Sequence, residues 1–207
     1  MKDRELTKQK IIDAVGEIFR TEGEKGLKIK RIADRAGIDR TLVYRYFGKD
    51  VKNLIEEYII QKDYWLQFFD KINAEVSKNS HETSKDLIID ILQNQWRYFS
   101  EAREMQQLIL WELSGGGDIM RSIHNTRELM AEPILELLDK SFEDSTIKFR
   151  PIVVLLLGGI YYANVHAIHN GNIICGMNVK SKEGQADMVN AIRQIIEWAY
   201  QNTDQVK

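Results

Sequence analysis

The sequence contains few helix breakers and one cysteine. Pro133 and Pro151 are the two prolines in 207 residues, and long stretches without proline favour helices over many short strands. Cys175 is alone, which excludes an intrachain disulfide, and its apolar neighbours on both sides predict that it packs in the interior. We therefore expect an all-α protein without disulfide bonds.

A long apolar run and an export signal are also missing. The most apolar stretch, Ile152 to Ala163, has about twelve residues, fewer than the roughly 20 that span a bilayer as a helix. The first ten residues, MKDRELTKQK, are charged throughout and lack the apolar core of a secretory signal. These features predict a buried helix at the apolar stretch, no membrane partner and a cytoplasmic location.

The net charge of −2 combines two segments of opposite sign. Residues 1–53 carry 14 Lys and Arg against 9 Asp and Glu, a net charge of +5, and residues 54–207 carry a net charge of −7. A surface that binds DNA needs cations, because they displace the counterions condensed on phosphates. The distribution therefore indicates a basic binding module attached to a body with another role.

The spacing of apolar residues predicts three helices in the basic segment. Thr7 is the expected N-cap of the first helix. The second covers Ile29 to Arg35 and is stopped by Gly37, and the third covers Arg40 to Tyr46 with Asp39 as its N-cap. Two short helices joined by a four-residue turn form a helix-turn-helix.

The third of these helices has the composition of a DNA-recognition helix. Between Lys25 and Lys52 there are nine Lys and Arg against three acids. Arginine reaches guanine edges, threonine and tyrosine contact methyl groups and phosphates, and lysine neutralises the backbone. The residues at this helix therefore predict entry into the major groove.

Four groups of residues in this segment resemble the DNA-binding signature of the tetracycline-repressor (TetR) family. They are Ile32-Ala33, Ala36-Gly37-Ile38, Leu42-Val43-Tyr44 and Tyr46-Phe47, and the likeness covers about residues 8–55. The sequence departs from the family at three positions. Lys28 and Asp39 stand where the family usually has Thr or Ser, although Asp39 can still cap a helix, and Asp50 replaces a lysine.

The resemblance implies a set of DNA contacts. Phosphate contacts are expected from the second helix, base contacts from the third, and further backbone contacts from the tyrosines and the following lysine. Because Asp50 lies between two lysines, either of these could make the last contact. The expected residues are Lys28, Lys30, Arg40, Thr41, Tyr44, Arg45, Tyr46, Lys49 and Lys52.

Longer helices are expected after the basic module. Each is apolar on more than one side, which is typical of a helical bundle. The first of them should run without a break from Val51 through Trp65 to Ser77 and form a lever into the body. The others are 84–103, 105–113, 119–140, 150–170 and 183–202. We expect a DNA-binding domain at 1–50 and a helical ligand-binding and dimerisation domain at 51–207.

The last two expected helices carry apolar residues at spacings of three and four. Paired with their copies in a second chain they would form a four-helix interface, although an intrachain core would give the same pattern. Gly158 and Gly159 lie in the middle of one of these helices, where each costs about 1 kcal/mol relative to alanine. This cost indicates a close helix approach or room for a ligand.

The body also contains aromatic, methionine and histidine residues that could line an apolar pocket, although such residues more often form a core. His166 and His169 lie one helical turn apart, but the sequence offers no third ligand at a telling distance, so no metal is expected. We expect no cofactor and no catalytic residues. The candidate ligand-binding residues are Trp96, Phe99, Met105, Trp111, His124, Tyr162 and His166.

The sequence thus favours a ligand-responsive transcription regulator, by resemblance a repressor, that binds double-stranded operator DNA as a homodimer and responds to a small apolar or aromatic effector. A second hypothesis is a DNA-binding regulator that is constitutive or controlled by a protein partner. A third is a helical enzyme or carrier with an incidental basic segment. Binding to duplex DNA that weakens steeply with salt would separate the first two hypotheses from the third.

Overall fold

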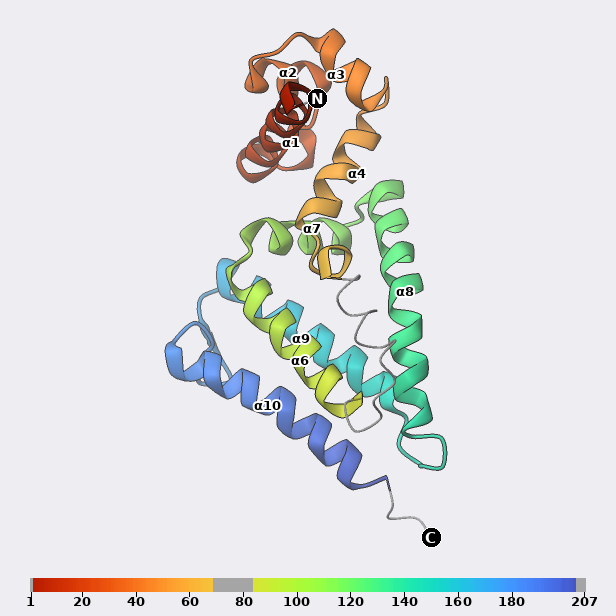
Figure 1. Cartoon of the computed structure of the whole chain (residues 1–207). Helices are drawn as coiled ribbons and strands as arrows, with labels where there is room; N and C mark the ends of the chain where they lie inside the picture. The colour runs from red at the N-terminus through yellow and green to blue at the C-terminus, as the bar shows by residue number, and fades with distance from the viewer. Residues whose placement is uncertain (1, 69–83, 204–207) are drawn as a thin grey trace. The chain divides into compact units, whose positions relative to one another are not determined.

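The protein is almost entirely helical. The computed structural model describes residues 2–68 and 84–203 (Figure 1). The helices are α1 (Lys2–Glu22), α2 (Ile29–Ala36), α3 (Arg40–Phe47), α4 (Val51–Lys62), α6 (Ser84–Glu101), α7 (Arg103–Leu113), α8 (Gly117–Lys140), α9 (Phe149–His169) and α10 (Lys182–Gln201). A 3-10 turn, η1, covers Glu24–Gly26, and two short strands, β1 (Ile173–Ile174) and β2 (Met177–Asn178), form a hairpin.

The chain divides into two compact units. The first contains 1–67 and 107–125, and the second contains 68–106 and 126–207. The first unit gathers the basic module together with most of α7 and the beginning of α8. These two units differ from the expected DNA-binding and ligand-binding domains, which meet near residue 50. That domain boundary stays a prediction.

Helix α1 begins earlier than the sequence indicated. It starts at Lys2, and the hydroxyl of Thr7 donates to the carbonyl of Asp3 at 2.7 Å, so Thr7 lies inside the helix and does not cap it. Asp3 and Glu5 lie in the first turn, where carboxylates interact favourably with the helix dipole. The predicted N-cap at Thr7 is therefore wrong.

The two ends of the helix-turn-helix match the predicted caps. Gly37 follows α2 with φ of 66°, in the left-handed region, and its N–H donates to the carbonyls of Ala33 and Asp34. Asp39 precedes α3, and its carboxylate accepts a hydrogen bond from the backbone N–H of Thr41 at 2.7 Å. Both predicted caps are confirmed.

Helix α4 is shorter than the predicted lever. It ends at Lys62, and Asp63 has extended backbone angles, φ −76° and ψ 125°. The buried Asp63 carboxylate accepts from the N–H groups of Trp65 and Leu66, at 3.0 and 3.2 Å, and so begins a new helix at residue 64. The prediction of an unbroken helix through Trp65 is wrong, because a buried aspartate caps the next helix there. The remainder of that predicted helix lies outside the described residues.

The second compact unit has α6 at its centre. Helix α6 packs against both α9 and α10 (Figure 1). Trp96 is fully buried, and its indole N–H donates to the side-chain oxygen of Gln185 on α10 at 2.9 Å. The side-chain amide of Gln93 likewise donates to the carbonyl of Val189 at 2.9 Å. These bonds fix the register of α10 along α6.

A two-stranded hairpin connects α9 and α10, between the helices expected at 150–170 and 183–202. Ile173 pairs with Asn178 and Ile174 with Met177 in an antiparallel register. Cys175 and Gly176 form the turn with φ of 51° and 79°, the left-handed values that tight hairpin turns require. Cys175 is exposed, so the prediction that it packs in the interior is wrong.

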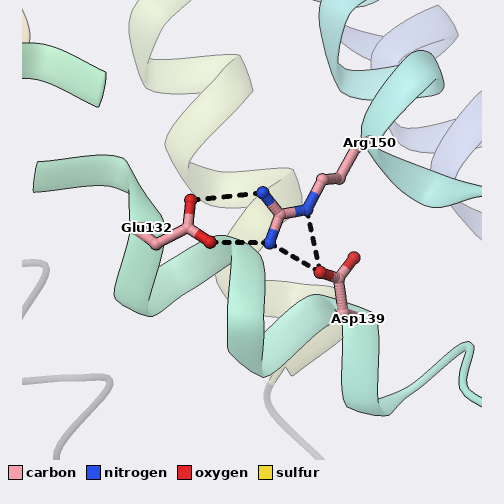
Figure 2. A network of polar contacts seen from close by, with 3 residues as sticks. All are labelled: Glu132, Asp139 and Arg150. Carbon is pink, nitrogen blue, oxygen red and sulfur yellow. Dashed lines mark hydrogen bonds and ion pairs between the residues drawn. The ribbon is translucent and has the colours of Figure 1, made fainter. Parts of the chain in front are cut away.

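Arg150 joins the start of α9 to α8 (Figure 2). Its guanidinium nitrogens lie 2.9 and 3.2 Å from the two carboxylate oxygens of Glu132, and 2.7 and 2.8 Å from Oδ2 of Asp139. Hydrogen bonds that its guanidinium donates to Glu132 and then to Asp139 raise the pKa of Arg150 above its ordinary value. An open cavity of about 690 Å³ lies beside this network. Its lining is Asp139, Lys140, Phe142, Glu143, Ile147, Lys148, Phe149, Arg150 and Pro151.

Helix α9 has the length of the predicted helix 150–170, but it is more exposed than predicted. It has 21 residues, and by length and composition alone it could cross a membrane, with a mean hydropathy of 1.6 over the best window, of which 28% is buried. Val154 is 67% exposed and Leu155 is 76% exposed. The predicted buried helix is therefore only partly buried within one chain, because only one side of α9 packs on α6.

The role of Asp63 can be tested by removing its carboxylate. We expect Asp63→Ala to lower the free energy of unfolding by about 1–2 kcal/mol, because the N–H groups of Trp65 and Leu66 lose their acceptor. Asp63→Asn keeps an acceptor oxygen and should lower the free energy of unfolding clearly less than Asp63→Ala does. Urea unfolding followed by circular dichroism measures both variants, and equal losses for Ala and Asn would contradict the capping role.

Candidate nucleic-acid interface

Helix α3 separates into a buried face and an exposed face. Val43 and Phe47 are buried and anchor the helix to the module. Arg40, Thr41, Tyr44 and Arg45 are all exposed on the same short helix. The pairs Arg40 with Tyr44 and Thr41 with Arg45 are each four residues apart, which places them on neighbouring parts of one surface. The structure thus brings the predicted base-contacting residues together.

The beginning of α3 is held by Asp39. Both the backbone N–H and the hydroxyl of Thr41 donate to the Asp39 carboxylate. The hydroxyl hydrogen bond of Thr41, then its backbone hydrogen bond and the charge of Arg40, hold the pKa of Asp39 below its ordinary value. Because the Thr41 hydroxyl is used in this cap, its methyl group and oxygen lone pairs are what the side chain can offer to a base.

Helix α2 carries two kinds of cation. Arg31 pairs with Glu22, and Arg35 pairs with Glu17 at 3.1 Å, so both arginines tie α2 to α1. Lys28, the residue that precedes α2, makes no capping hydrogen bond with its side chain, and Lys28 and Lys30 are both exposed. The two predicted phosphate contacts are thus the cations available on this helix surface.

The segment between α3 and α4 explains the unusual aspartate at position 50. Asp50 is the N-cap of α4 and accepts from the backbone N–H of Lys52 at 2.9 Å. The ammonium of Lys52 lies 3.9 Å from the carboxylate of Asp118, and both side chains are largely exposed. Lys49 is exposed on the other side of the cap. The replacement of lysine by aspartate therefore supplies a helix cap.

Two cations of α1 also reach this surface, and the sequence analysis did not include them. The guanidinium of Arg4 lies 5.7 Å from the ring centroid of the half-buried Tyr46, and the ammonium of Lys8 lies 5.8 Å from the ring of Phe47. At such distances a cation is attracted to the face of an aromatic ring. The four-residue spacing of Arg4 and Lys8 was the available signal, but their contact with α3 depends on the tertiary fold.

Helix α7 contributes an aromatic contact to the DNA-binding module. The ring of Trp111 lies 5.7 Å from that of Phe19 on α1, and Phe19 lies 6.0 Å from Tyr58 on α4. On α8, Nδ1 of His124 lies 3.6 Å from Oε1 of Glu112 on α7. Trp111 and His124, both predicted to line a ligand pocket, therefore belong to the first compact unit.

The other candidate pocket residues belong to the second compact unit. Trp96, Phe99 and Met105 are completely buried in its core, while Tyr162 is 63% exposed beside His166, with ring centroids 5.4 Å apart. The structure does not gather these residues around the cavity near Arg150. Among the described residues no group of three His, Cys, Asp or Glu side chains could hold a metal ion.

Two apolar stripes remain exposed on the last two helices. On α9 the stripe contains Leu155, Gly158, Gly159 and Tyr162, and a Cβ atom added at either glycine would meet open space. On α10, Ile195 and Trp198 are exposed at 37% and 56%, although Ile192 and Ile196 on the same helix are buried. Both helices therefore present an apolar face outside the core of the single chain.

The comparisons with known proteins agree with this geometry. Residues 11–51 match the family described as bacterial regulatory proteins, tetR family. Among solved structures, the fatty acid degradation regulator FadR from Bacillus halodurans is similar over 92% of this chain and 94% of its own, with 15% identity and a TM-score of 0.63. FadR from Bacillus subtilis, in complex with stearoyl-CoA, is similar over 91% of this chain and 96% of its own, with 16% identity and a TM-score of 0.62.

A third solved structure, RolR in complex with resorcinol, is similar over 98% of this chain and 95% of its own, with 13% identity and a TM-score of 0.50. No curated protein sequence matches the chain significantly. The helix-turn-helix and the helical body define a DNA-binding transcription regulator. Residues 11–51 therefore form a DNA-binding domain of the tetR family of bacterial regulatory proteins.

The Asp39 cap should make the stability of the module depend on pH. Because the folded pKa lies below the ordinary value, the carboxylate stabilises the fold fully above about pH 4 and loses this effect as the pH falls through the lowered pKa. We expect Asp39→Ala to melt at a lower temperature than the parent protein at pH 7, and this difference to shrink towards pH 3. Asp34→Ala on the exposed face of α2 is the control. If the melting temperatures of Asp39→Ala and the parent protein differed by the same amount at every pH, the role of the carboxylate charge would be refuted.

Proposed function

We propose that the protein is a ligand-responsive, sequence-specific repressor that binds an inverted-repeat operator as a homodimer in the cytoplasm, without catalytic activity, metal or cofactor. The observation that carries the proposal is the exposed set of Arg40, Thr41, Tyr44 and Arg45 on the second helix of a helix-turn-helix. In such a motif this helix enters the major groove.

The proposed DNA contacts follow from exposure and charge. Arg40, Thr41 and Arg45 read base edges, while Lys28, Lys30, Tyr44 and Tyr46 contact the sugar-phosphate backbone. Between the two lysines that flank Asp50, we assign the backbone contact to Lys49, because the Lys52 ammonium has the Asp118 carboxylate at 3.9 Å. Arg4 and Lys8 add positive charge behind the aromatic residues of α3.

The proposed dimer forms through α9 and α10. A second copy would cover the exposed apolar stripes on both helices, including Leu155, Tyr162 and Trp198. Open space at Gly158 and Gly159 would allow the backbones of two α9 helices to approach closely. A twofold dimer of this kind repeats the recognition helix, which is why the operator should be an inverted repeat.

The proposed effector is a small apolar or aromatic molecule that binds in the body. The similar structure of FadR from Bacillus subtilis contains stearoyl-CoA, and that of RolR contains resorcinol. In this chain Trp96, Phe99 and Met105 supply apolar and aromatic surface within the second compact unit. The earlier candidates Tyr162 and His166 fit the dimer surface better, because Tyr162 is exposed beside the two glycines.

We propose that α7 transmits the ligand signal, since α4 ends at Lys62. Near the start of α7, the side-chain amide of Gln106 donates a hydrogen bond to the carbonyl of Phe99 on α6. Near the end of α7, the ring of Trp111 packs on Phe19 of α1. A shift of this one helix would therefore reach the DNA-binding module. Derepression by about 10–100-fold needs only roughly 1.4–2.7 kcal/mol of coupling, and operator DNA must weaken ligand binding by the same factor.

A constitutive or partner-controlled regulator is the second candidate. It is favoured by the complete burial of Trp96, Phe99 and Met105, which is typical of a packed core. Equal affinity of an effector for the protein with and without operator DNA would support this candidate over an induced repressor.

Selection of bound fragments from a random duplex pool tests the DNA-binding function and supplies the operator. We expect Arg40→Ala and Arg45→Ala each to weaken operator binding by ~1–3 kcal/mol and to relax sequence preference. Lys28→Ala should weaken all duplexes alike and lower the dependence of log affinity on log salt by about one. Fluorescence anisotropy at several salt concentrations measures both effects.

The matched control is Arg35→Ala, because Arg35 is paired with Glu17 and should not contact DNA. If the alanine variants of Arg40, Arg45 and Lys28 all lost affinity equally for every duplex, the assignment of the two arginines as base readers would be incorrect. Failure to select any duplex would reject the proposed function itself.

The dimer proposal predicts opposite effects of one substitution on the helix and on the assembly. Gly159→Ala should favour the helix by about 1 kcal/mol, since the new methyl group meets nothing within 4 Å in the single chain. It should nevertheless weaken dimerisation, because that space is needed by the second α9. Leu155→Glu should give the 24.1 kDa monomer in sedimentation experiments.

Leu129→Glu on α8 is the control for an exposed leucine, since Leu129 is 78% exposed and lies outside both stripes. We expect this variant to remain dimeric. A monomeric parent protein at micromolar concentration, or one that partitions into lipid vesicles through α9, would argue against the interface.

A further inference from the structure

The carboxylate of Asp39 has one oxygen that the helix cap does not use. The backbone N–H and the hydroxyl of Thr41 both donate to Oδ1 of Asp39, the backbone group at 2.7 Å. Among the described residues, no hydrogen bond or ion pair reaches Oδ2. Because Asp39 is exposed, this second oxygen is an acceptor that can meet a group outside the chain.

The two bonds to Thr41 also fix the orientation and the charge of the carboxylate. Both donors hold Oδ1, which directs Oδ2 away from the cap. The hydroxyl and backbone hydrogen bonds of Thr41, and then the charge of Arg40, hold the pKa of Asp39 below its ordinary value. An ionised carboxylate accepts hydrogen bonds and has no proton to donate. At neutral pH, Asp39 therefore offers one oriented acceptor.

Asp39 lies at the position where a helix-turn-helix reads its bases. It directly precedes Arg40, the first residue of α3, and the N-terminal residues of a recognition helix are those that contact base edges. A negative charge at this place is unfavourable near phosphates, because like charges repel. Serine and asparagine cap helices as well as aspartate does. Capping alone therefore gives no reason for a carboxylate here, whereas a base that offers a donor does.

We propose that Oδ2 of Asp39 accepts a hydrogen bond from the exocyclic amino group of a cytosine in the major groove of the operator. This inference rests on the proposed DNA-binding function and names one base of its target. In the major groove cytosine presents a donor and no acceptor. Guanine and thymine present acceptors there, and adenine has the acceptor N7 beside its amino group. Because a carboxylate is repelled by acceptors, cytosine is the base that Asp39 selects.

The cap makes the substitution Asp39→Asn decisive. The atom at the position of Oδ1 must remain an acceptor, because the backbone N–H of Thr41 donates to it. The amide oxygen of the asparagine therefore takes the cap, and its NH2 group takes the place of Oδ2. Asparagine is as good an N-cap as aspartate, so α3 keeps its start while the outward acceptor becomes a donor.

The test repeats the selection from a random duplex pool with the full-length parent protein, Asp39→Asn and Asp39→Ser. For the parent protein we expect one position in each half-site at which cytosine is required. Asp39→Asn should change the preferred base at this position to guanine or thymine, whose acceptors suit a donor. Asp39→Ser keeps a cap but shortens the side chain, and should accept all four bases there.

Fluorescence anisotropy at one salt concentration measures the size of the effect. The parent protein should bind the selected operator roughly tenfold more tightly than a duplex with guanine or thymine in place of that cytosine. Asp39→Asn should reverse the order of the two affinities. The preferred bases at all other positions should stay those of the parent protein.

Asp50→Asn is the matched control. Asp50 is also an exposed N-cap, and its carboxylate accepts from the backbone N–H of Lys52 at 2.9 Å, but it precedes α4 and not the recognition helix. This variant removes the same charge and should bind all duplexes more tightly without a change in the preferred bases. Circular dichroism checks that each variant folds, and if Asp39→Asn does not fold, the preference of Asp39→Ser decides.

The inference is overturned if the parent protein has no position that requires cytosine, or if Asp39→Asn prefers any base other than guanine or thymine at that position. An unchanged operator for both Asp39 variants would leave Asp39 as a helix cap only. Each of these results leaves sequence-specific DNA binding in place. Failure of the parent protein to select any duplex would instead reject the proposed function.

Discussion

The arrangement of the DNA-binding surface depends on the burial of the apolar face of α1. Ile11, Val15 and Ile18 are at most 1% exposed and lie at helical spacing, and α1 packs on both α2 and α4. Buried aliphatic side chains of this size each contribute about 1.5–3 kcal/mol. Because α3 packs in turn on α2 and α4, the same core determines where the recognition helix points.

Cations in the basic module have two separate roles. Arg31 and Arg35 form ion pairs with acids of α1, so their charge is neutralised locally and serves the packing of α2. Lys28, Arg40 and Arg45 are exposed on the module and can therefore neutralise phosphates or reach base edges. The net charge of a segment does not distinguish the two roles, because pairing is decided by which helices lie together.

The body has more apolar surface than one chain buries. Helix α10 turns Ile192 and Ile196 inward and leaves Ile195 and Trp198 exposed, and α9 similarly exposes Val154 and Leu155. Exposed apolar faces of this kind mark interaction surfaces in soluble proteins. The core of this unit also buries Gln93 and Asn164, whose side-chain amides donate to the carbonyls of Val189 and Ile160, as buried polar groups require. The exposed faces of α9 and α10 are the surfaces through which we propose that the protein dimerises.

The sequence by itself determined the features that depend on neighbouring residues. The helix-turn-helix, the left-handed Gly37 and the Asp39 cap follow from residues within a few positions of each other, and helical periodicity located most of the body helices. The break at Asp63 is equally local, because its carboxylate caps N–H groups two and three residues further on. The tertiary structure alone decided the contact of Arg4 with Tyr46. It also decided which apolar faces of α9 and α10 stay exposed. These features depend on side chains far apart in the sequence, and local propensity carries no information about which distant residues will meet.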